Sequence, residues 1–482
     1  MKDFKLANTT TFEDSRSIAK EIFSGSAFPD FRLKKRAISI FSTLLRYVGK
    51  PFGQAFGEWG STKAFYRFIE NERVESEMLG ETICKQGAIN CRSHDKVYAV
   101  NDTTVVEIKH SLMNEELGSI DQFADHLGML LHSTMGVSAK GLPLGLLNQQ
   151  FWTREKKVKK KLSKKERERE KSEAKKRPIE EKESYKWLRA VESTKQVLSE
   201  QLGDSMPQIV FVGDRESDIY EYFEKIKQEE VGTITRVTHN RQVEGSEEKL
   251  RAHVLSQEVK KTLTLKVPRN RTRKKRKARV SIRYVSEVTL LAPKNRGVLL
   301  PKIQLGAVYV KEIDPPATLK PREVIDWFLL TTEPVENVDD ALDIIEKYKY
   351  RWLIEVFHYV LKSGCRIEKY QFEKFERYHK IIILQSEVAF ELLRMTHISR
   401  IHPDFPATEI LSQLHIDVLK IQTRIRAGPP LTVKVAVALI GRMGGHLGRK
   451  SDGFPGVKTL WQGWRDLNLL VDFVKTGRNL DE

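Results

Sequence analysis

The chain has 482 residues, 40% of them hydrophobic, which is enough for roughly two to four domains with hydrophobic cores. Its net charge is +18, from 83 Lys and Arg against 65 Asp and Glu, which indicates a polyanionic partner. No apolar run approaches the roughly 18 residues of a membrane-spanning helix, and the three cysteines imply neither a zinc finger nor a disulfide framework. Because the first residues lack a signal-peptide core, we expect a cytoplasmic protein.

Two short stretches carry the excess positive charge. Residues 154–177 contain 14 Lys and Arg against 5 Glu, and residues 269–283 contain 9 Lys and Arg and no acid. Each stretch has a net charge of +9, so the rest of the chain sums to zero. Charge this concentrated is typical of a polyanion-binding surface, and the low-complexity stretch 154–177 is equally typical of a solvated, disordered loop. The two interpretations are compatible, because a flexible basic loop can still bind phosphates.

Residues 1–75 are predicted to form helices with basic and aromatic residues between them. The candidates for phosphate or base contacts are Arg32, Lys34, Lys35, Arg36, Arg46, Tyr47, Lys50, Lys63 and Arg67. An ordinary solvated helical face explains any single one of them equally well. We name Arg36, Tyr47 and Arg67 as DNA-binding residues and predict a helical DNA-binding domain over 1–75.

Residues 76–400 are predicted to form an α/β domain. The expected elements are a helix over 76–95, strands at 97–100, 128–137 and 143–152, a helix at 186–202, a strand at 208–214, a helix at 219–227 and a strand at 233–237. This layout is typical of an RNase H-like mixed sheet with helices on both faces. Between about 238 and 335 the pattern changes to alternating strands, which predicts an antiparallel β insertion. The basic run from Arg269 would be a loop of this insertion near the site.

Two aspartates come at the ends of apolar runs. Asp102 ends the run 96–102 and Asp214 ends the run 208–214, and both runs have the β-branched character of buried strands. A carboxylate at the end of a core strand lies where a sheet opens into a crevice. Two such strands in one sheet could therefore bring Asp102 and Asp214 close together. For either aspartate alone, a turn or helix cap is the more common explanation.

The segment 348–362 carries polar residues spaced for one face of a helix, namely Tyr348, Arg351, Glu355 and Lys362. At about 100° per residue they fall within an arc of roughly 60°. One acid among cations suits phosphate chemistry, because the acid holds a metal ion and the bases hold the phosphodiester. The ordinary alternative for an Arg–Glu pair four residues apart is a surface ion pair.

Glu355 would complete a cluster of three carboxylates with the two aspartates. Like charges packed this closely repel one another unless a cation neutralises them. Oxygen-only ligands favour Mg²⁺ or Mn²⁺ over zinc. We therefore predict that Asp102, Asp214 and Glu355 bind two Mg²⁺ ions, for which Mn²⁺ can substitute, about 3.5–4 Å apart.

Residues 401–482 are predicted to form a helical C-terminal domain punctuated by prolines. In the last predicted helix, 457–475, the apolar residues Leu460, Trp464, Leu467 and Val471 form one stripe. The stripe either packs against its own domain or forms the seam of a dimer, and the sequence leaves both open.

Together these motifs resemble those of the cut-and-paste DDE transposases of bacterial insertion sequences. The subgroup is the one with the Tyr-x2-Arg-x3-Glu-x6-Lys signature, called insertion sequence family four. Asn101-Asp102-Thr-Thr resembles the first-aspartate block, Gly213-Asp214-Arg-Glu-Ser-Asp the second, and the segment 348–362 keeps the spacing of the third. The flanking blocks that also resemble the family are Ala64-Phe-Tyr-Arg67-Phe-Ile, Asp326-Trp327-Phe-Leu-Leu-Thr-Thr, Gly444-Gly445 and Leu460-Trp461-x-Gly-Trp464. The chain departs from the family at Asn101, where an acid is common, and at Thr238, where a base is expected.

The resemblance implies a metal-dependent DNA transposase that works as a homodimer on double-stranded DNA. It also implies a bacterial cytoplasmic protein that is associated with the nucleoid. Asp102, Asp214 and Glu355 would be the catalytic metal ligands. Residues 1–75 would read the inverted-repeat ends of the transposon, and residues 401–482 would pair two copies. The residues implied to contact DNA near the cut are Tyr348, Arg351 and Lys362 on phosphates, Trp327 on a flipped base and, less directly, Arg236.

The implied chemistry is a nick at the transposon end, a hairpin, a blunt end and then strand transfer into target DNA. Two alternatives remain open from the sequence. One is a transposase-derived repressor that binds DNA without cutting it. The other is an RNase H-like nuclease without strand transfer, which would still cut after deletion of residues 1–75.

Overall fold

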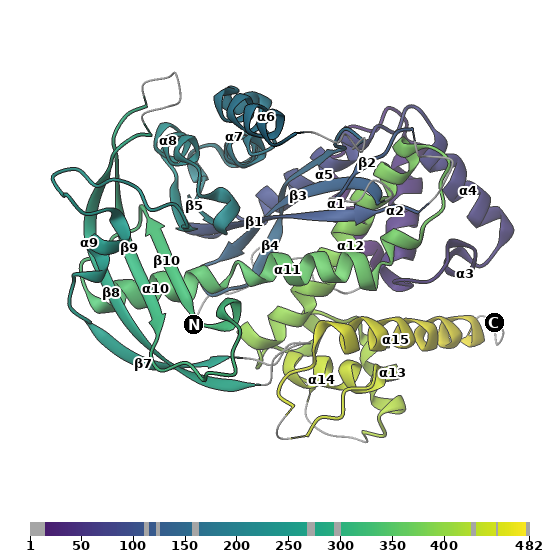
Figure 1. Ribbon diagram of the computed structural model, residues 1–482. Helices are drawn as coiled ribbons and strands as arrows, with labels where there is room; N and C mark the ends of the chain where they lie inside the picture. The colour runs from purple at the N-terminus through teal and green to yellow at the C-terminus, as the bar shows by residue number, and fades with distance from the viewer. Residues whose placement is uncertain are drawn as a thin grey trace.

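The computed structural model describes residues 15–109, 115–121, 126–156, 163–267, 275–293, 300–425, 430–449 and 452–478. Residues 269–274 of the basic run that begins at Arg269 therefore lie outside the described residues, as does part of the basic stretch 154–177. Figure 1 shows helices at both chain ends and a large sheet between them. None of the described helices combines the length and apolar character that crossing a bilayer requires.

A ten-stranded mixed sheet forms the centre of the molecule. Its order is β2-β3-β1-β5-β6-β10-β9-β8-β7, and β4 pairs with β3 beside this path. The strands are β1 (Lys96–Glu107), β2 (Gly118–Ser119), β3 (Leu127–Ser138), β4 (Pro143–Trp152), β5 (Gln208–Gly213), β6 (Gly232–Arg236), β7 (Lys261–Val267), β8 (Arg276–Leu290), β9 (Ile303–Glu312) and β10 (Asp326–Thr331). Antiparallel β4, β3 and β1 followed by parallel β5 and β6 give the predicted RNase H-like arrangement, so the predicted fold class is confirmed.

The predicted β insertion is antiparallel and continues the same sheet. β10 pairs with β6, with Leu329 opposite Arg236 and Thr331 opposite Ile234. β9, β8 and β7 then follow as antiparallel neighbours. The insertion is therefore joined to the edge of the RNase H-like core by backbone hydrogen bonds, which fixes its position relative to the ends of β5 and β6.

Helices cover both faces of the sheet. The helices before and within the sheet region are α1 (Ser15–Ile22), α2 (Phe31–Arg46), α3 (Phe52–Phe56), α4 (Trp59–Glu70), α5 (Ser76–Ile89), α6 (Lys164–Lys176), α7 (Tyr185–Leu202), α8 (Tyr220–Gln228), α9 (Leu250–Leu255), α10 (Val338–Lys349) and α11 (Trp352–Tyr359). On one face, Trp187 of α7 contacts the ring of His132 on β3 at a centroid distance of 4.7 Å. On the other face α11 lies over β1 and β3.

The C-terminal part is helical, as predicted, with α12 (Phe375–Ile401), α13 (Gln413–Gln422), α14 (Val433–Met443) and α15 (Val457–Arg478). α12 is the long helix that contacts α2, α4 and α5 as well as α14 and α15. Figure 1 shows α15 running beneath the N-terminal helices.

The apolar stripe of α15 packs within its own chain. Its members are buried, namely Leu460, Trp464, Leu467 and Val471. The Trp464 indole Nε1–H donates to the carbonyl of Leu45 on α2 at 2.9 Å, and its ring stacks on His415 of α13. The core-packing explanation is therefore correct, and the explanation of these residues as a dimer seam is wrong, because one protomer already buries them.

Candidate active site

The register between β1 and β5 places Asp102 beside Asp214. The strands are parallel, and their last hydrogen-bonded pair is Val100 opposite Val212. Asp102 and Asp214 each lie two residues beyond that pair. Because side chains two residues apart lie on the same face of a sheet, both aspartates are on the face that carries the two valines. Neighbouring strands are about 4.8 Å apart, which brings the two carboxylates into the same small region.

The prediction that a strand ends at Asp102 is wrong. β1 continues to Glu107, because β3 stays paired with it as far as the pair Glu107 and Gly128. The strand that ends is β5, at Gly213. Asp102 therefore lies where β1 no longer has β5 beside it. The expected crevice in the sheet is made by the end of β5 alone and not by the ends of both strands.

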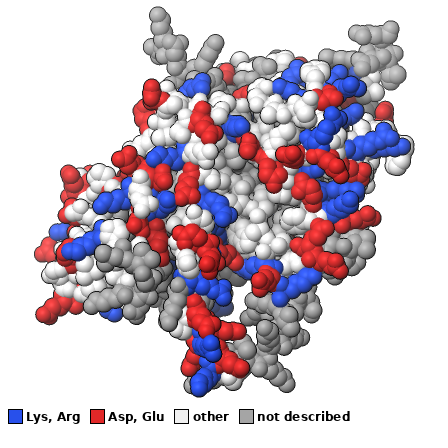
Figure 2. Space-filling model, turned by 90° about the horizontal axis from the view of Figure 1, so that it is seen from above, with Lys and Arg blue, Asp and Glu red and all other residues white. Residues whose placement is uncertain are grey.

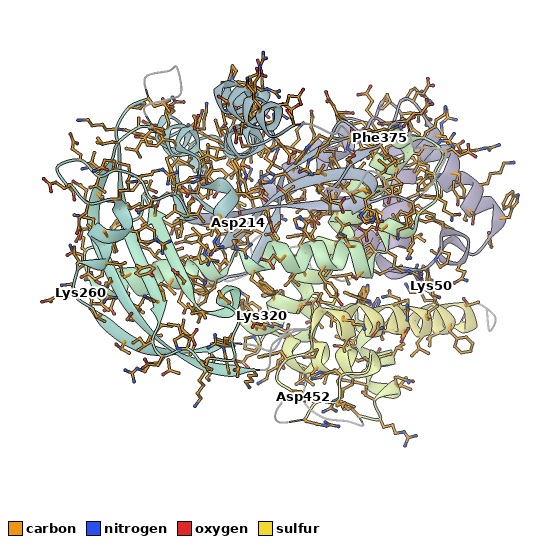
Figure 3. The ribbon with its side chains drawn as sticks, viewed as in Figure 1. Lys50, Asp214, Lys260, Lys320, Phe375 and Asp452 are labelled. Atoms are coloured by element: carbon orange, nitrogen blue, oxygen red, sulfur yellow. The ribbon has the colours of Figure 1, made fainter. Side chains whose placement is uncertain are left out.

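Asp214 also caps a turn. It precedes the 3₁₀ turn Arg215–Ser217, and its Oδ1 accepts a hydrogen bond from the Glu216 amide at 2.8 Å. The ordinary explanation of an aspartate after a strand is thus correct for Asp214, alongside its position next to Asp102. Figure 3 shows Asp214 near the middle of the molecule, where β5 ends.

The segment that carries Glu355 is helical but interrupted. α10 ends at Lys349 and α11 begins at Trp352, with Tyr350 and Arg351 in a turn between them. The Tyr350 hydroxyl donates to the Ala139 carbonyl at 3.0 Å, which ties this turn to the β3–β4 connection. α11 then passes into the π-helical turn Val360–Gly364. The expectation of one continuous helical stripe is therefore wrong at both of these points.

Arg351 links two of the three candidate acids. Its guanidinium is hydrogen-bonded to the Glu355 carboxylate and lies 3.8 Å from the Asp102 carboxylate. Burial and the negative charge of Asp214 raise the pKa of Asp102 to about 7, although Arg351 and the Thr103 amide oppose this shift. The site is thus short of positive charge in the absence of a cation.

Trp327, Tyr348 and Arg236 come together beside this cluster. The Trp327 and Tyr348 rings meet edge to face at 5.5 Å. Arg236 donates to the Asp326 carbonyl at 2.8 Å and interacts with the Tyr348 hydroxyl. Burial raises the pKa of Tyr348, so this phenol is neutral at physiological pH. The pairing of β6 with β10 explains why these residues, far apart in sequence, share one place.

Lys362 lies apart from the other residues of the predicted stripe. Its ammonium donates to the Val105 carbonyl at 2.8 Å and pairs with Glu368 at 2.9 Å. Val105 is three residues beyond Asp102 on β1, or roughly 10 Å along the strand. Lys362 comes seven residues after Glu355, which is roughly 10 Å along a helix at 1.5 Å per residue and accounts for this separation.

The N-terminal candidates are divided between two places. Arg36 and Tyr47 border a cavity of about 320 Å³ beside α2, and Arg67 is exposed on α4. The Tyr47 hydroxyl donates to Asp472 of α15, which also pairs with Arg46. An adjoining cavity of about 490 Å³ is lined largely by bases, namely Arg16, Lys20, Lys34, Lys35 and Arg46. Elsewhere Figure 2 shows acids and bases interspersed, with no single basic field on the face it presents.

Two buried residues near the aspartates were missed from the sequence. Ser133 is the cross-strand partner of Asp102 on β3, and its buried hydroxyl has no hydrogen-bond partner. Asp218 is buried at the end of the turn that Asp214 begins. The β1–β3 register could not be read from the sequence, so nothing there pointed to Ser133. The Asp218 position was visible in the second-aspartate block but was given no role.

The oxygen-rich site suits a hard divalent cation in its donor chemistry. Within the described part of the chain, no three His, Cys, Asp or Glu side chains converge closely enough to hold one ion. Instead Arg351 supplies the positive charge between Asp102 and Glu355. The Ser133 hydroxyl beside Asp102 has no hydrogen-bond partner, and a water molecule on a hydrated cation could form a hydrogen bond with it. A bound cation would therefore replace Arg351 as the neutralising charge.

Models of three protein families match the chain. "Transposase DNA-binding" matches residues 15–74, "Transposase DDE domain" matches 189–386, and "Transposase Tn5 dimerisation domain" matches 388–482. The DDE match contains Asp214 and Glu355 and begins after Asp102. Among solved structures, a piggyBac transposase synaptic complex with hairpin DNA is similar at 8% identity, with a TM-score of 0.37 over 83% of this chain and 77% of that chain. We infer nothing from a similarity at that level.

Replacing Asp102 with Asn should stabilise the metal-free protein at alkaline pH. The folded protein holds the Asp102 proton up to about pH 7, whereas the unfolded chain releases it near 3.8. The cost of burying the charge is therefore absent below pH 3.8, grows as the pH rises, and reaches up to about 4 kcal/mol above pH 7. We expect calorimetry in EDTA to show a higher Tm for Asp102→Asn than for wild type at pH 8, and a smaller difference at pH 5. An equal or lower Tm at pH 8, with exposed Asp204→Asn as the control, would contradict this.

Proposed function

Since this chain belongs to the DDE transposases and is a DNA transposase, we propose that it moves its element by cut-and-paste transposition, with Asp102, Asp214 and Glu355 as the catalytic acids. The observation that carries this proposal is the β1–β5 register, which brings Asp102 and Asp214 side by side beneath α11. Glu355 reaches the same place through Arg351, which contacts it and Asp102.

DDE transposases use a divalent metal ion, and we propose that this chain uses two Mg²⁺ ions, for which Mn²⁺ can substitute. Asp102, Asp214 and Glu355 would hold them, and Ser133 would support the Asp102 carboxylate. When bound, such ions activate the attacking oxygen and stabilise the leaving oxygen of a phosphodiester displacement. Arg351 would then be free to bind the DNA phosphate at the cut.

The proposed reaction is a series of in-line displacements at phosphorus. Water first breaks a phosphodiester at the transposon end and leaves a 3′-OH. That 3′-OH attacks the opposite strand, which forms a hairpin and releases the flanking DNA. A second water opens the hairpin to a blunt end, and the 3′-OH then attacks target DNA. Because each step exchanges one oxygen for another on phosphorus, one set of acids serves all four steps.

Trp327 is proposed to hold the base that a tight hairpin extrudes. Its partly exposed ring already meets Tyr348 edge to face, so a base stacked on it would lie beside Tyr348 and Arg236. Tyr348, Arg351 and Arg236 would hold the adjacent phosphates. Lys362 would contact the DNA backbone farther along β1, provided that it leaves Glu368.

The chain binds DNA and forms dimers through its terminal domains. We propose that residues 1–75 bind the inverted-repeat ends, that 76–400 form the catalytic domain with its insertion at about 238–335, and that 401–482 pair two protomers in a synaptic complex. Arg36 and Arg67 would contact the end DNA directly. Tyr47 would have to leave Asp472 before its hydroxyl could do so.

The decisive experiment incubates the purified protein with Mg²⁺ and a plasmid carrying the inverted repeats that flank its own gene. End-specific nicks, hairpins and excised linear DNA are expected, with Asp102→Ala as the inactive control. Binding to the ends without cutting, in either Mg²⁺ or Mn²⁺, would instead support a repressor.

Glu355→Gln should abolish cleavage and leave end binding nearly unchanged. The amide keeps a hydrogen-bond acceptor for Arg351 but removes the charge that a divalent cation requires. Cleavage is read on a denaturing gel and binding by mobility shift on the same end duplex. A Glu355→Gln protein that still nicks DNA would show that the assigned acids are wrong.

Trp327→Ala should slow hairpin formation more than the first nick. A lost base–aromatic stack costs about 1–3 kcal/mol, which corresponds to a slowing of roughly 5- to 150-fold. Trp327→Phe, which keeps an aromatic face, should restore most of the rate. Equal slowing of both steps would place Trp327 in general DNA positioning and not in base capture.

The β7–β8 hairpin is proposed to bind DNA phosphates. Lys266 and Lys277 are exposed and directly opposed across the two strands, and Arg279 is exposed two residues farther along β8. Opposed like charges are destabilising unless a counter-charge lies over them. The bases at 269–274 of the same basic run lie outside the described residues.

Changing Lys266, Lys277 and Arg279 to Gln should flatten the salt dependence of DNA affinity. The slope of log K against log salt should fall by about 1 for each lost phosphate contact. Lys227→Gln, which removes an exposed charge on α8, is the control and should leave the slope unchanged. If the triple variant keeps the wild-type slope, this hairpin does not touch DNA.

A further inference from the structure

Asp218 holds together the two loops that leave β5 and β6. Its side chain is fully buried. Its Oδ2 accepts hydrogen bonds from the Thr238 amide at 2.6 Å and the His239 amide at 2.7 Å, and it also contacts His239 Nδ1 at 3.0 Å. The Arg241 guanidinium pairs with the same carboxylate and also donates to the Asp218 carbonyl at 3.2 Å. One buried carboxylate therefore contacts three residues of the second loop, Thr238, His239 and Arg241.

The first of these loops is the one that begins with Asp214. The Ser217 hydroxyl donates to the Asp214 carbonyl at 2.8 Å, and Asp218 follows Ser217 directly. The second loop leaves β6 immediately after Arg236, which contacts Tyr348. The carboxylate of Asp218 thus connects the backbone of a candidate metal ligand to the backbone of a candidate DNA contact.

We propose that Asp218 is a positioning residue for the reaction: it fixes the turn that carries Asp214, and hence the distance between the Asp214 and Asp102 carboxylates. This inference rests on the proposed function, in which Asp214 binds metal. β5 ends at Gly213, so no sheet hydrogen bond holds Asp214 in place. The repulsion between Asp214 and Asp102 acts on that unpaired backbone, and the contacts of the buried Asp218 carboxylate oppose it.

The test measures metal binding, using Mn²⁺ alone as the probe. Calorimetric titration of Mn²⁺ is made into the complex of the full chain with a pre-cleaved transposon-end duplex. Asp218→Asn keeps an oxygen for the two amides but removes the charge that pairs with Arg241. We expect its half-saturating Mn²⁺ concentration to rise about tenfold, with end-DNA affinity within about twofold of wild type. Arg241→Lys, a milder change at the other side of the pair, should give an intermediate rise.

The matched control is Glu312→Gln. Glu312 is also a buried carboxylate that pairs with an arginine, Arg276, and accepts a backbone amide, that of Ile325 at 3.0 Å. It belongs to β9 in the insertion, so its loss should lower Tm without changing the Mn²⁺ half-saturation.

Comparison with Asp214→Asn separates this inference from the proposed function on which it rests. If Asp218→Asn lowers Tm but leaves Mn²⁺ half-saturation at the wild-type value, Asp218 only stabilises the fold and the inference is wrong. If Asp214→Asn also leaves Mn²⁺ binding unchanged, the metal site itself is wrongly assigned. Loss of Mn²⁺ affinity in Asp214→Asn but not in Asp218→Asn would overturn the positioning role alone.

Discussion

Repulsion between carboxylates at the end of β5 is the constraint on which the rest of the site depends. The parallel β1–β5 register brings Asp102 and Asp214 side by side, because each lies two residues beyond the last hydrogen-bonded pair of these strands. The protein neutralises this charge locally with Arg351, which contacts Asp102 and Glu355. In the proposed function the same arginine also binds the DNA phosphate, so charge balance in the free protein and substrate binding would use one side chain.

This arrangement explains why so many groups around the aspartates are tied to backbone. Asp214 is held by its own turn and by Ser217, and Arg236 is anchored on the Asp326 carbonyl. Tyr350 fixes the turn before α11 to Ala139. Side chains with one strong anchor each can keep like charges close, at a cost in stability that a divalent cation offsets.

The fold class could be predicted from the sequence because it rests on local signals, and the same signals led to the proposal of the three acids. Apolar runs of strand length ending in Asp102 and Asp214 mark the core strands, and the spacing around Glu355 marks a helix. The end of β1 could not be predicted, because it depends on pairing with β3, a partner that the local pattern does not reveal. The break at Tyr350 was hidden for a similar reason, since a contact to Ala139, far away in sequence, accompanies it. The spacing of the stripe gave only the angle of Lys362 around the helix, and its position seven residues after Glu355 puts it roughly 10 Å farther along the axis.

The continuity of the sheet from β6 into β10 gives the insertion a direct part in the site. A separately folded insertion would bring Trp327 toward the acids only through a flexible connection. Backbone pairing of Leu329 with Arg236 instead fixes Trp327 two residues away from that pair, on a strand rigidly joined to the core. The Trp327 ring and the arginine beside it then keep one geometry relative to Asp214. In the proposed reaction, which bends DNA sharply at the cut, this rigidity matters because the energy for distorting the DNA has to come from contacts made by rigid parts of the protein.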